Sequence, residues 1–396
     1  MAETINIPRE STMQQIANAV EMIAFANSAD LRNISAWKQI SGLVKNRYAQ
    51  KIFDYGDQFI EKWTDTAGAV EYEYPWRVNH FENIELENGE VVPGMYLQAH
   101  YAHPFGVQFS NARAFLACPD GLSAGTYNVM LGADWGSNVK ANTYWSFTLT
   151  QDVSSGGRLA GFIGMPDVST SSWKVISYAA DGITKIETVS VESGQNGTDL
   201  GTLQYGTRNG NLNSMQETAY GWNRWKTSAI RQYLNSDQPK GKWWTPQDEW
   251  DIAPEQLATK DGFLCGLPDD MKQAIKTVKN TTYTNTVQDG GTADITYDKV
   301  FLPSLEQMYI NPQISGEGNL HEYWKRRSGS SNKFQQWGTY PRLIHYAVEN
   351  HTSPQIVRLR SAYRDVASYT WFVISSGLVH YNVASNAHRF SPLVVM

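Results

Sequence analysis

Two histidines and two cysteines are the side chains whose types and spacing first suggest chemistry. His100 and His103 stand three residues apart, which raises the question of a shared metal ion. In a strand-like stretch such a pair points to opposite faces, so we expect ordinary hydrogen-bonded histidines. Cys118 and Cys265 lie far apart in what read as different domains, and no metal-binding cysteine spacing is present. A disulfide between them is an open but less favoured alternative.

Catalytic motifs give little support to an enzyme. The sequence contains no HExxH pair, no Walker sequence and no GxGxxG loop. Carboxylates are numerous, but no pair is marked by its local context as an acid and a base, so glycoside hydrolysis is neither indicated nor excluded. Asp269 and Asp270 precede an apolar helical pattern, and we interpret them as a helix cap. We therefore expect no catalytic residue and no cofactor.

Composition favours a β-rich recognition protein. The formal net charge is −6, whereas a phosphate-binding surface needs a basic field, so no nucleic-acid partner is expected. Charged residues make up 18% and aromatic residues 12% of the chain, a balance typical of strands and turns. Tyrosine and tryptophan also supply contact area at low entropic cost, as in binding surfaces. No apolar run is long enough to span a membrane, and residues 1–9 lack a signal-peptide core, so we expect no membrane insertion.

The elements that would position a site change along the chain. Residues 1–66 show helical periodicity, in one segment with Ile16, Val20 and Ile23 and in a second between Ile34 and Ile52. These helices either pack on the next domain or form an attachment or oligomerisation module, and periodicity does not separate the two. Residues 67–192 have the rhythm of an all-β sandwich, and residues 193–201 read as a linker. Residues 202–396 mix helix and strand, with helices expected at 221–235 and after residue 269. The fold class expected is α+β with several domains.

The most informative segment is 359–392. Strand rhythm at 370–374, a Ser-Ser-Gly turn at 375–377 and a returning run at 378–381 predict a β-hairpin. If Trp371 and Val373 face the core, alternation directs Phe372 and Ile374 outward, into an exposed patch that indicates an interaction site. The alternative is that a second layer covers this face. The segment contains no Lys, Glu, Gln or Met, which argues mildly against that alternative.

The same segment resembles the C-terminal repeat of proteins diversified by retroelements. The resemblance rests on a frame of small and fixed residues, namely 360–362, 364, 370–371, 373, 375–377, 379, 384–385, 387 and 389–392. In that family, reverse transcription randomises adenines of a template, so AAY codons never become Lys, Glu, Gln, Met or Trp codons. The composition of the segment fits this limit, and Trp371 falls at a frame position.

A wider resemblance covers roughly the last half of the chain. Segments 220–225, 228–231, 234–235, 262–264, 298–304 and 357–361 are similar to the C-type-lectin-like domain of many such targets, which is also the fold of formylglycine-generating enzymes. The chemistry of those enzymes uses cysteines near the C-terminal active site, and no cysteine follows Cys265. No Glu-Pro-Asn-type calcium motif occurs, so no metal is expected.

The resemblance implies a set of variable ligand-binding residues in the gaps of the frame. They are Tyr363, Asp365, Ser368, Tyr369, Phe372, Ile374, Leu378, His380, Tyr381, Asn382 and Val383. A possible second cluster lies within 335–345 and comprises Trp337, Arg342, Ile344 and His345, although Gln336 and Trp337 are not AAY-derived. The implied scaffold residues are Trp222, Trp225, Arg360, Trp371 and Arg389. We expect the frame arginines Arg360, Arg364 and Arg389 to bind backbone carbonyls beneath the loops rather than a ligand.

The function implied is capture of a host cell-surface receptor, protein or glycan, by a phage tail adhesin. Such a protein is made in the bacterial cytoplasm and assembles into the virion as a homo-oligomer, for which we expect a trimer. Its N-terminal region contacts other tail proteins. Alternatives are a bacterial surface or secreted adhesin of the same class and a fixed structural virion protein.

Overall fold

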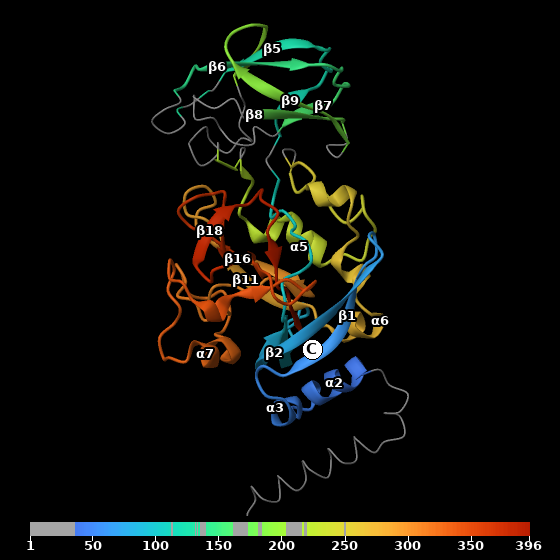
Figure 1. The fold of residues 1–396 in the computed structure, drawn as a ribbon, viewed down its shortest axis with the longest axis vertical. Helices are drawn as coiled ribbons and strands as arrows, with labels where there is room; N and C mark the ends of the chain where they lie inside the picture. The colour runs from blue at the N-terminus through green and yellow to red at the C-terminus, as the bar shows by residue number, and fades with distance from the viewer. Residues whose placement is uncertain are drawn as a thin grey trace, which may run out of the picture.

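The structure is a computed structural model that describes residues 36–111, 114–130, 132, 134, 140–160, 173–180, 184–202, 216–217, 220–248 and 251–396. It mixes helix and strand, with strands in the majority, as the composition predicted. Figure 1 shows a strand-rich body at one end and a mixed body below it. None of the helices in the described ranges is long and apolar enough to cross a membrane.

A five-stranded sheet joins the two ends of the described chain. Its order is β1-β2-β3-β20-β13, with β1 (Gln58–Asp65), β2 (Val70–Glu85), β3 (Val91–Ala99), β20 (Leu393–Val395) and β13 (Val300–Phe301). Leu393 pairs with Gln98 and Val394 with Leu97, in antiparallel register. One apolar core accordingly runs from Trp37 to Met396. The predicted boundary at 66/67 is wrong, because it separates the paired strands β1 and β2, and the strands before residue 100 belong to the body that contains the C-terminus. The predicted boundary at 201/202 lies at the end of the sheet that is inserted between these parts.

A seven-stranded sheet is inserted between those parts. Its order is β10-β5-β6-β9-β8-β7-β4, with β4 (Ala114–Cys118), β5 (Gly125–Met130), β6 (Tyr144–Leu149), β7 (Gly157–Ala160), β8 (Trp173–Tyr178), β9 (Lys185–Ser193) and β10 (Thr198–Thr202). Its own core includes Trp145, Phe147 and Val175. The described strands form one hydrogen-bonded sheet rather than the two of a sandwich. The predicted linker is also wrong in part, because β10 pairs in parallel with β5.

The first described helices cover the five-stranded sheet. In α2 (Ala36–Lys45) the side chains of Trp37, Ile40 and Val44 are buried, as their helical spacing predicted. α2 packs on β3 and on α6 (Asp269–Ala274), and α3 (Ala49–Ile52) follows it. Of the two alternatives for these helices, residues 36–52 thus pack on their own domain, whereas the segment around Ile16 lies outside the described residues. Residues 58–65 form strand β1, which corrects the all-helical prediction for 1–66.

The remaining helices are short. They are η2 (Trp225–Thr227), α5 (Ala229–Leu234), η3 (Glu255–Ala258), η4 (Phe263–Gly266), α6 (Asp269–Ala274), α7 (Glu322–Ser328) and η5 (Pro341–Leu343). The predicted helix at 221–235 is realised as η2 and α5. Asp269 and Asp270 lie in the first turn of α6 after Pro268, and no side chain caps the helix. They still favour its N-terminus electrostatically.

The last strands build the region of the predicted hairpin. β11 (Val278–Tyr283) pairs with β12 (Ala293–Asp298), and β14 (His345–Tyr346) with β15 (Pro354–Gln355). A four-stranded sheet has the order β18-β17-β16-β19, from β16 (Val357–Ala362), β17 (Tyr369–Val373), β18 (Val379–Val383) and β19 (Arg389–Phe390). The predicted hairpin is confirmed as β17 and β18, with Gly377 in the left-handed conformation of its turn.

Candidate functional site

Three tyrosines gather on one face of the β17–β18 hairpin. Cross-strand pairing places Trp371 opposite Tyr381 and Tyr369 opposite Val383. Trp371 is fully buried, as predicted, and the tyrosines lie over it. The ring of Tyr381 stacks on that of Tyr369, with centroids 4.8 Å apart, and lies 4.3 Å from that of Tyr363. We call Trp337, Tyr363, Tyr369 and Tyr381 the aromatic surface.

Trp337 reaches this surface from a different segment. Its side chain is 49% exposed, and its ring meets those of Tyr381 and His380 edge to face at 5.1 and 5.0 Å. Its backbone adopts φ 66°, a conformation that bulky residues rarely take. The Trp337 amide donates to the Val379 carbonyl at 2.9 Å, and the Val379 amide donates to the Gly338 carbonyl at 3.0 Å. These bonds continue the sheet beyond β18 and hold Trp337 in place despite the backbone strain.

Polar groups border the rings on one side. The exposed Asp365 carboxylate accepts from Gln313 Nε2 at 3.2 Å, and Gln313 Oε1 accepts from Trp371 Nε1 at 3.1 Å. Burial, and then Asp365, raise the pKa of Tyr363, whereas burial and then Tyr381 raise the pKa of Tyr369. Both phenols are therefore neutral near pH 7 and can donate hydrogen bonds. The surface combines flat apolar faces with a few directional polar groups.

The loop between β16 and β17 is fixed from below by Asn223. Its buried amide Nδ2 lies 3.1, 2.8 and 2.7 Å from the backbone oxygens of Tyr363, Val366 and Tyr369. Asn223 Oδ1 in turn accepts from Asn285 Nδ2 at 3.0 Å. Asn223 lay inside a segment quoted for the family resemblance, but its role was missed, because nothing local to 220–225 indicates contact with 363–369.

Arginine side chains hold the strands that carry the site. Arg360 donates to the Leu302 carbonyl at 2.9 Å and to the Glu317 carbonyl, and Arg364 donates to the Thr284 carbonyl at 2.9 Å. The carbonyl-binding role predicted for these two is confirmed. Arg389 instead forms an ion pair with Glu349 at 2.7 Å, so that part of the prediction is wrong.

A further buried arginine was not singled out from the sequence. Arg358 donates to the carbonyls of Val383 at 3.0 Å and Asn386 at 2.8 Å. Burial lowers its pKa to about 9. Its guanidinium ties β16 to the end of β18 and to the segment that follows.

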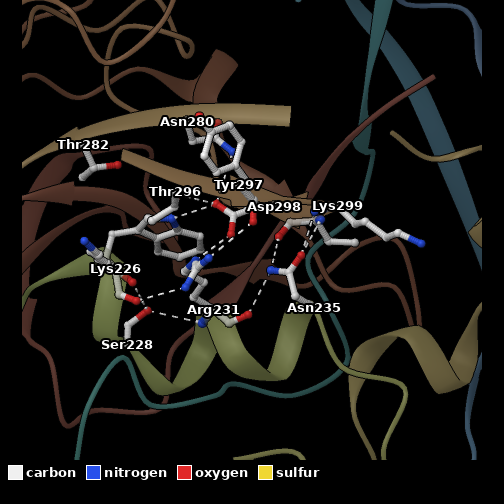
Figure 2. A network of polar contacts seen from close by, with 12 residues as sticks. Lys226, Ser228, Arg231, Asn235, Asn280, Thr282, Thr296, Tyr297, Asp298 and Lys299 are labelled. Carbon is white, nitrogen blue, oxygen red and sulfur yellow. Dashed lines mark hydrogen bonds and ion pairs between the residues drawn. The ribbon is translucent and has the colours of Figure 1, made fainter. Parts of the chain in front are cut away.

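The predicted scaffold tryptophans are buried and hydrogen-bonded. Trp222 Nε1 donates to Asp289 Oδ2 at 2.7 Å, and Trp225 Nε1 to Asp298 Oδ2 at 3.3 Å. Asp298 also accepts from Arg231 Nε at 2.6 Å and from Thr296 Oγ1 at 2.7 Å. Figure 2 shows this carboxylate between the helix that carries Arg231 and the strand that carries Thr296, so it joins α5 to β12.

Three predicted site residues are buried and do not form part of a surface. Phe372 is 3% exposed, because the segment after β18 folds back and places His388 against it, with ring centroids 5.4 Å apart. Ser368 is fully buried, since its carbonyl accepts from the Ala384 amide at 2.7 Å. His345 is 2% exposed because Trp324 of α7 packs on it at 5.6 Å. The outward direction predicted for Phe372 is wrong: a second layer covers that face.

The other predicted positions are at least partly accessible, but not all adjoin the rings. Ile374 and Leu378 flank the hairpin turn, where the Ile374 amide donates to the Leu378 carbonyl at 2.9 Å. Asn382 accepts from Asn386 Nδ2 at 3.2 Å. Arg342 is exposed and donates to the Arg327 carbonyl at 3.0 Å. Partly buried residues complete this set: His380, Val383 and Ile344.

One sequence feature with catalytic spacing has no matching structural context. Residues 121–125 read Gly-Leu-Ser-Ala-Gly, which fits GxSxG. Ser123 is exposed, and the turn leads into strand β5. A nucleophile elbow instead leads from a strand into a helix. Among the described residues, no group of three or more His, Cys, Asp or Glu side chains could hold a metal ion.

Comparison with known proteins places the aromatic surface inside a recognised domain. Residues 200–392 match the model of a domain of unknown function, DUF6273. Neither a curated protein nor a solved structure matches the chain. The matched stretch contains Asn223, Trp337 and the whole hairpin, so the site and the residues that position it lie within one sequence domain.

Proposed function

We propose that this chain is a ligand-capturing protein that binds a cell-surface receptor through the aromatic surface, without catalysis. The observation that carries the proposal is the set of three tyrosine rings and the half-exposed Trp337 gathered over the buried Trp371. Tyrosine and tryptophan supply large contact areas with few rotatable bonds, and they dominate the energetics of many interfaces.

Rigidity beneath the rings supports the same proposal. Asn223 fixes the loop from Tyr363 to Tyr369, and Arg358 fixes the end of β18. A surface ordered before binding loses less entropy when the ligand arrives. Exposed side chains on such a frame can also be exchanged at little cost in stability.

The resemblance to retroelement targets gives the finer form of the proposal. The C-terminal domain would be a C-type-lectin-like scaffold whose accessible gap positions are diversified, with Ser368, Phe372 and His345 left out because they are buried. Trp337 would be a constant member of the surface, since AAY codons do not yield Trp. The protein would act in a phage tail as a homotrimer, in which several weak contacts combine into firm attachment. Its N-terminal region would bind other tail proteins.

Binding to host cells tests the proposal. The probe is the fluorescently labelled full chain, applied to cells of the bacterium in whose genome or prophage the gene lies. The variant combines Tyr369→Ser and Tyr381→Ser, and the control is Ile60→Ser, which changes an exposed residue on β1. We expect the double variant to lose cell binding while the control retains it. Equal binding by all three proteins would overturn the proposal.

A further inference from the structure

A basic segment lies next to the aromatic surface in the sequence. Between residues 323 and 348 there are five Lys or Arg residues and no Asp or Glu, in a chain whose formal net charge is −6. Such a local excess of one sign produces a field that favours anions. Lys325 and Arg326 form ion pairs with Glu322, so the cations that give the excess are Arg327, Lys333 and Arg342.

This segment, together with Asn311, lines a cavity of about 530 Å³ that is open to solvent, between the end of α7 and the turn that carries Tyr340. That volume lies within the range typical of small-ligand sites. The residues that line it include the aromatic Tyr340, the neutral polar residues Ser331, Asn332 and Gln335, and the cationic Lys333.

The aromatic part of the wall is held firmly. The Tyr340 ring packs against the buried Phe334 with centroids 4.8 Å apart. Its hydroxyl accepts from the Gln335 amide at 2.9 Å. The Tyr340 amide donates to the Gly377 carbonyl at 2.9 Å, which ties the cavity wall to the turn of the variable hairpin.

The polar part of the wall contains side-chain groups that could still form hydrogen bonds or ion pairs with a ligand. Within the described part of the chain, the Lys333 ammonium and the Asn332 side-chain amide make no hydrogen bond or ion pair. At the Ser328 end, Arg327 Nε donates to the Arg342 carbonyl at 2.7 Å, and Arg342 donates to the carbonyls of Arg327 and Ser328. Neither arginine lines the cavity, but both guanidinium groups are bonded to neutral oxygens, so their charges add to the positive field beside it.

We propose that this cavity binds an acidic sugar, a pyranose unit that carries a carboxylate. Lys333 would pair with the carboxylate, the hydroxyl and amide groups would bond to the ring hydroxyls, and the apolar face of the pyranose would lie on Tyr340. A nucleic-acid strand is less favoured, because phosphate backbones are bound by many cations along a stripe. The cavity is separate from the aromatic surface, so this proposal does not depend on the proposed function.

Titration calorimetry on the full chain tests it with three probes: a trigalacturonate, the same oligosaccharide with its carboxyl groups methyl-esterified, and a single-stranded oligonucleotide. We expect the acid form to bind and the ester to bind about five-fold more weakly, the upper end of the range for one exposed ion pair. Lys333→Gln should weaken the acid form by a similar factor, whereas the matched control Lys51→Gln, on α3, should not. Thermal unfolding confirms that both variants are folded.

A variant on the other surface separates the two proposals. Tyr381→Ser should leave trigalacturonate binding unchanged even if it abolishes binding to cells. Equal affinities for acid and ester, equal effects of Lys333→Gln and Lys51→Gln, or absence of sugar binding at millimolar concentration would overturn the acidic-sugar site. Binding of the oligonucleotide alone would overturn it in favour of a nucleic-acid ligand.

Discussion

The side-chain nitrogen of Asn223 lies 2.7 Å from the backbone oxygen of Tyr369, across 146 residues of sequence. The same nitrogen also faces the carbonyls of Tyr363 and Val366, so one buried amide holds both ends of the loop that presents the tyrosines. The geometry of this surface thus depends on a residue that has no contact with the solvent.

Replacing Asn223 with Ala should loosen that loop. Buried carbonyls that lose their donor cost about 1–3 kcal/mol of unfolding free energy, and we expect a loss of that size in urea denaturation. Asn332→Ala, at an exposed position, is the control and should change stability by less than about 0.5 kcal/mol. If the Asn223→Ala variant were as stable as the unsubstituted protein, the loop would keep its conformation without this amide, which would contradict the role given to Asn223.

Phe372 and Tyr369 should respond differently to truncation, although both lie on β17. Phe372 is buried against His388, so Phe372→Ala should lower the unfolding free energy by about 3–5 kcal/mol. Tyr369 is partly exposed, and Tyr369→Ala should cost about 1 kcal/mol or less and act mainly on ligand binding. A larger drop in melting temperature for Tyr369→Ala than for Phe372→Ala would mean that Tyr369, and not Phe372, lies on the buried face of the hairpin.

Asp298→Asn should destabilise the body that supports the site. The Asp298 carboxylate has no exposed surface and pairs with Arg231, whose side chain is only partly exposed. Loss of the charge leaves Arg231 without its counter-ion, and we expect a loss of about 3–5 kcal/mol in chemical denaturation. Asp120→Asn removes a charge from an exposed turn and serves as the control. Comparable stability of the two variants would contradict the role given to the network in Figure 2.

Stability should fall on mild acidification, in part because of His345. Burial lowers the pKa of His345 to about 3 from an ordinary value of 6.5. Between these values the unfolded chain binds a proton that the folded chain does not, so stability is full above pH 6.5 and declines as the pH falls toward 3. Each such histidine contributes a slope of about 1.4 kcal/mol per pH unit within that window. His345→Gln should flatten the curve measured by denaturation between pH 4 and 7, whereas Tyr346→Phe should not; equal slopes in both variants would contradict the assignment.

Local patterns in the sequence predicted those structural features that depend only on residues close together in the chain. Strand alternation and the Ser-Ser-Gly turn are enough to define the β17–β18 hairpin, and helical spacing is enough to identify the buried face of α2. The burial of Trp371 also followed from strand alternation, whereas the carbonyl-binding role of Arg360 was expected from its place in the frame of the family resemblance.

The predictions that proved wrong concern features that depend on contacts between segments far apart in the sequence. The pairing of Leu393 with Gln98 joins strands almost 300 residues apart, and no local sequence pattern predicts this pairing. Phe372 is buried because His388 folds back over a face that alternation alone leaves open. Trp337 completes the aromatic surface through a left-handed backbone conformation that its residue type does not favour.

Sequencing the C-terminal coding region in many independent isolates tests the central claim most directly. The account predicts substitutions concentrated at accessible gap positions such as Tyr363, Asp365, Tyr369 and Tyr381, with matching adenines in a nearby template repeat. Trp337, Trp371 and Phe372 should stay constant. A uniform sequence without a template repeat, or substitutions as frequent at Trp371 and Phe372 as at Tyr369 and Tyr381, would contradict a diversified binding surface.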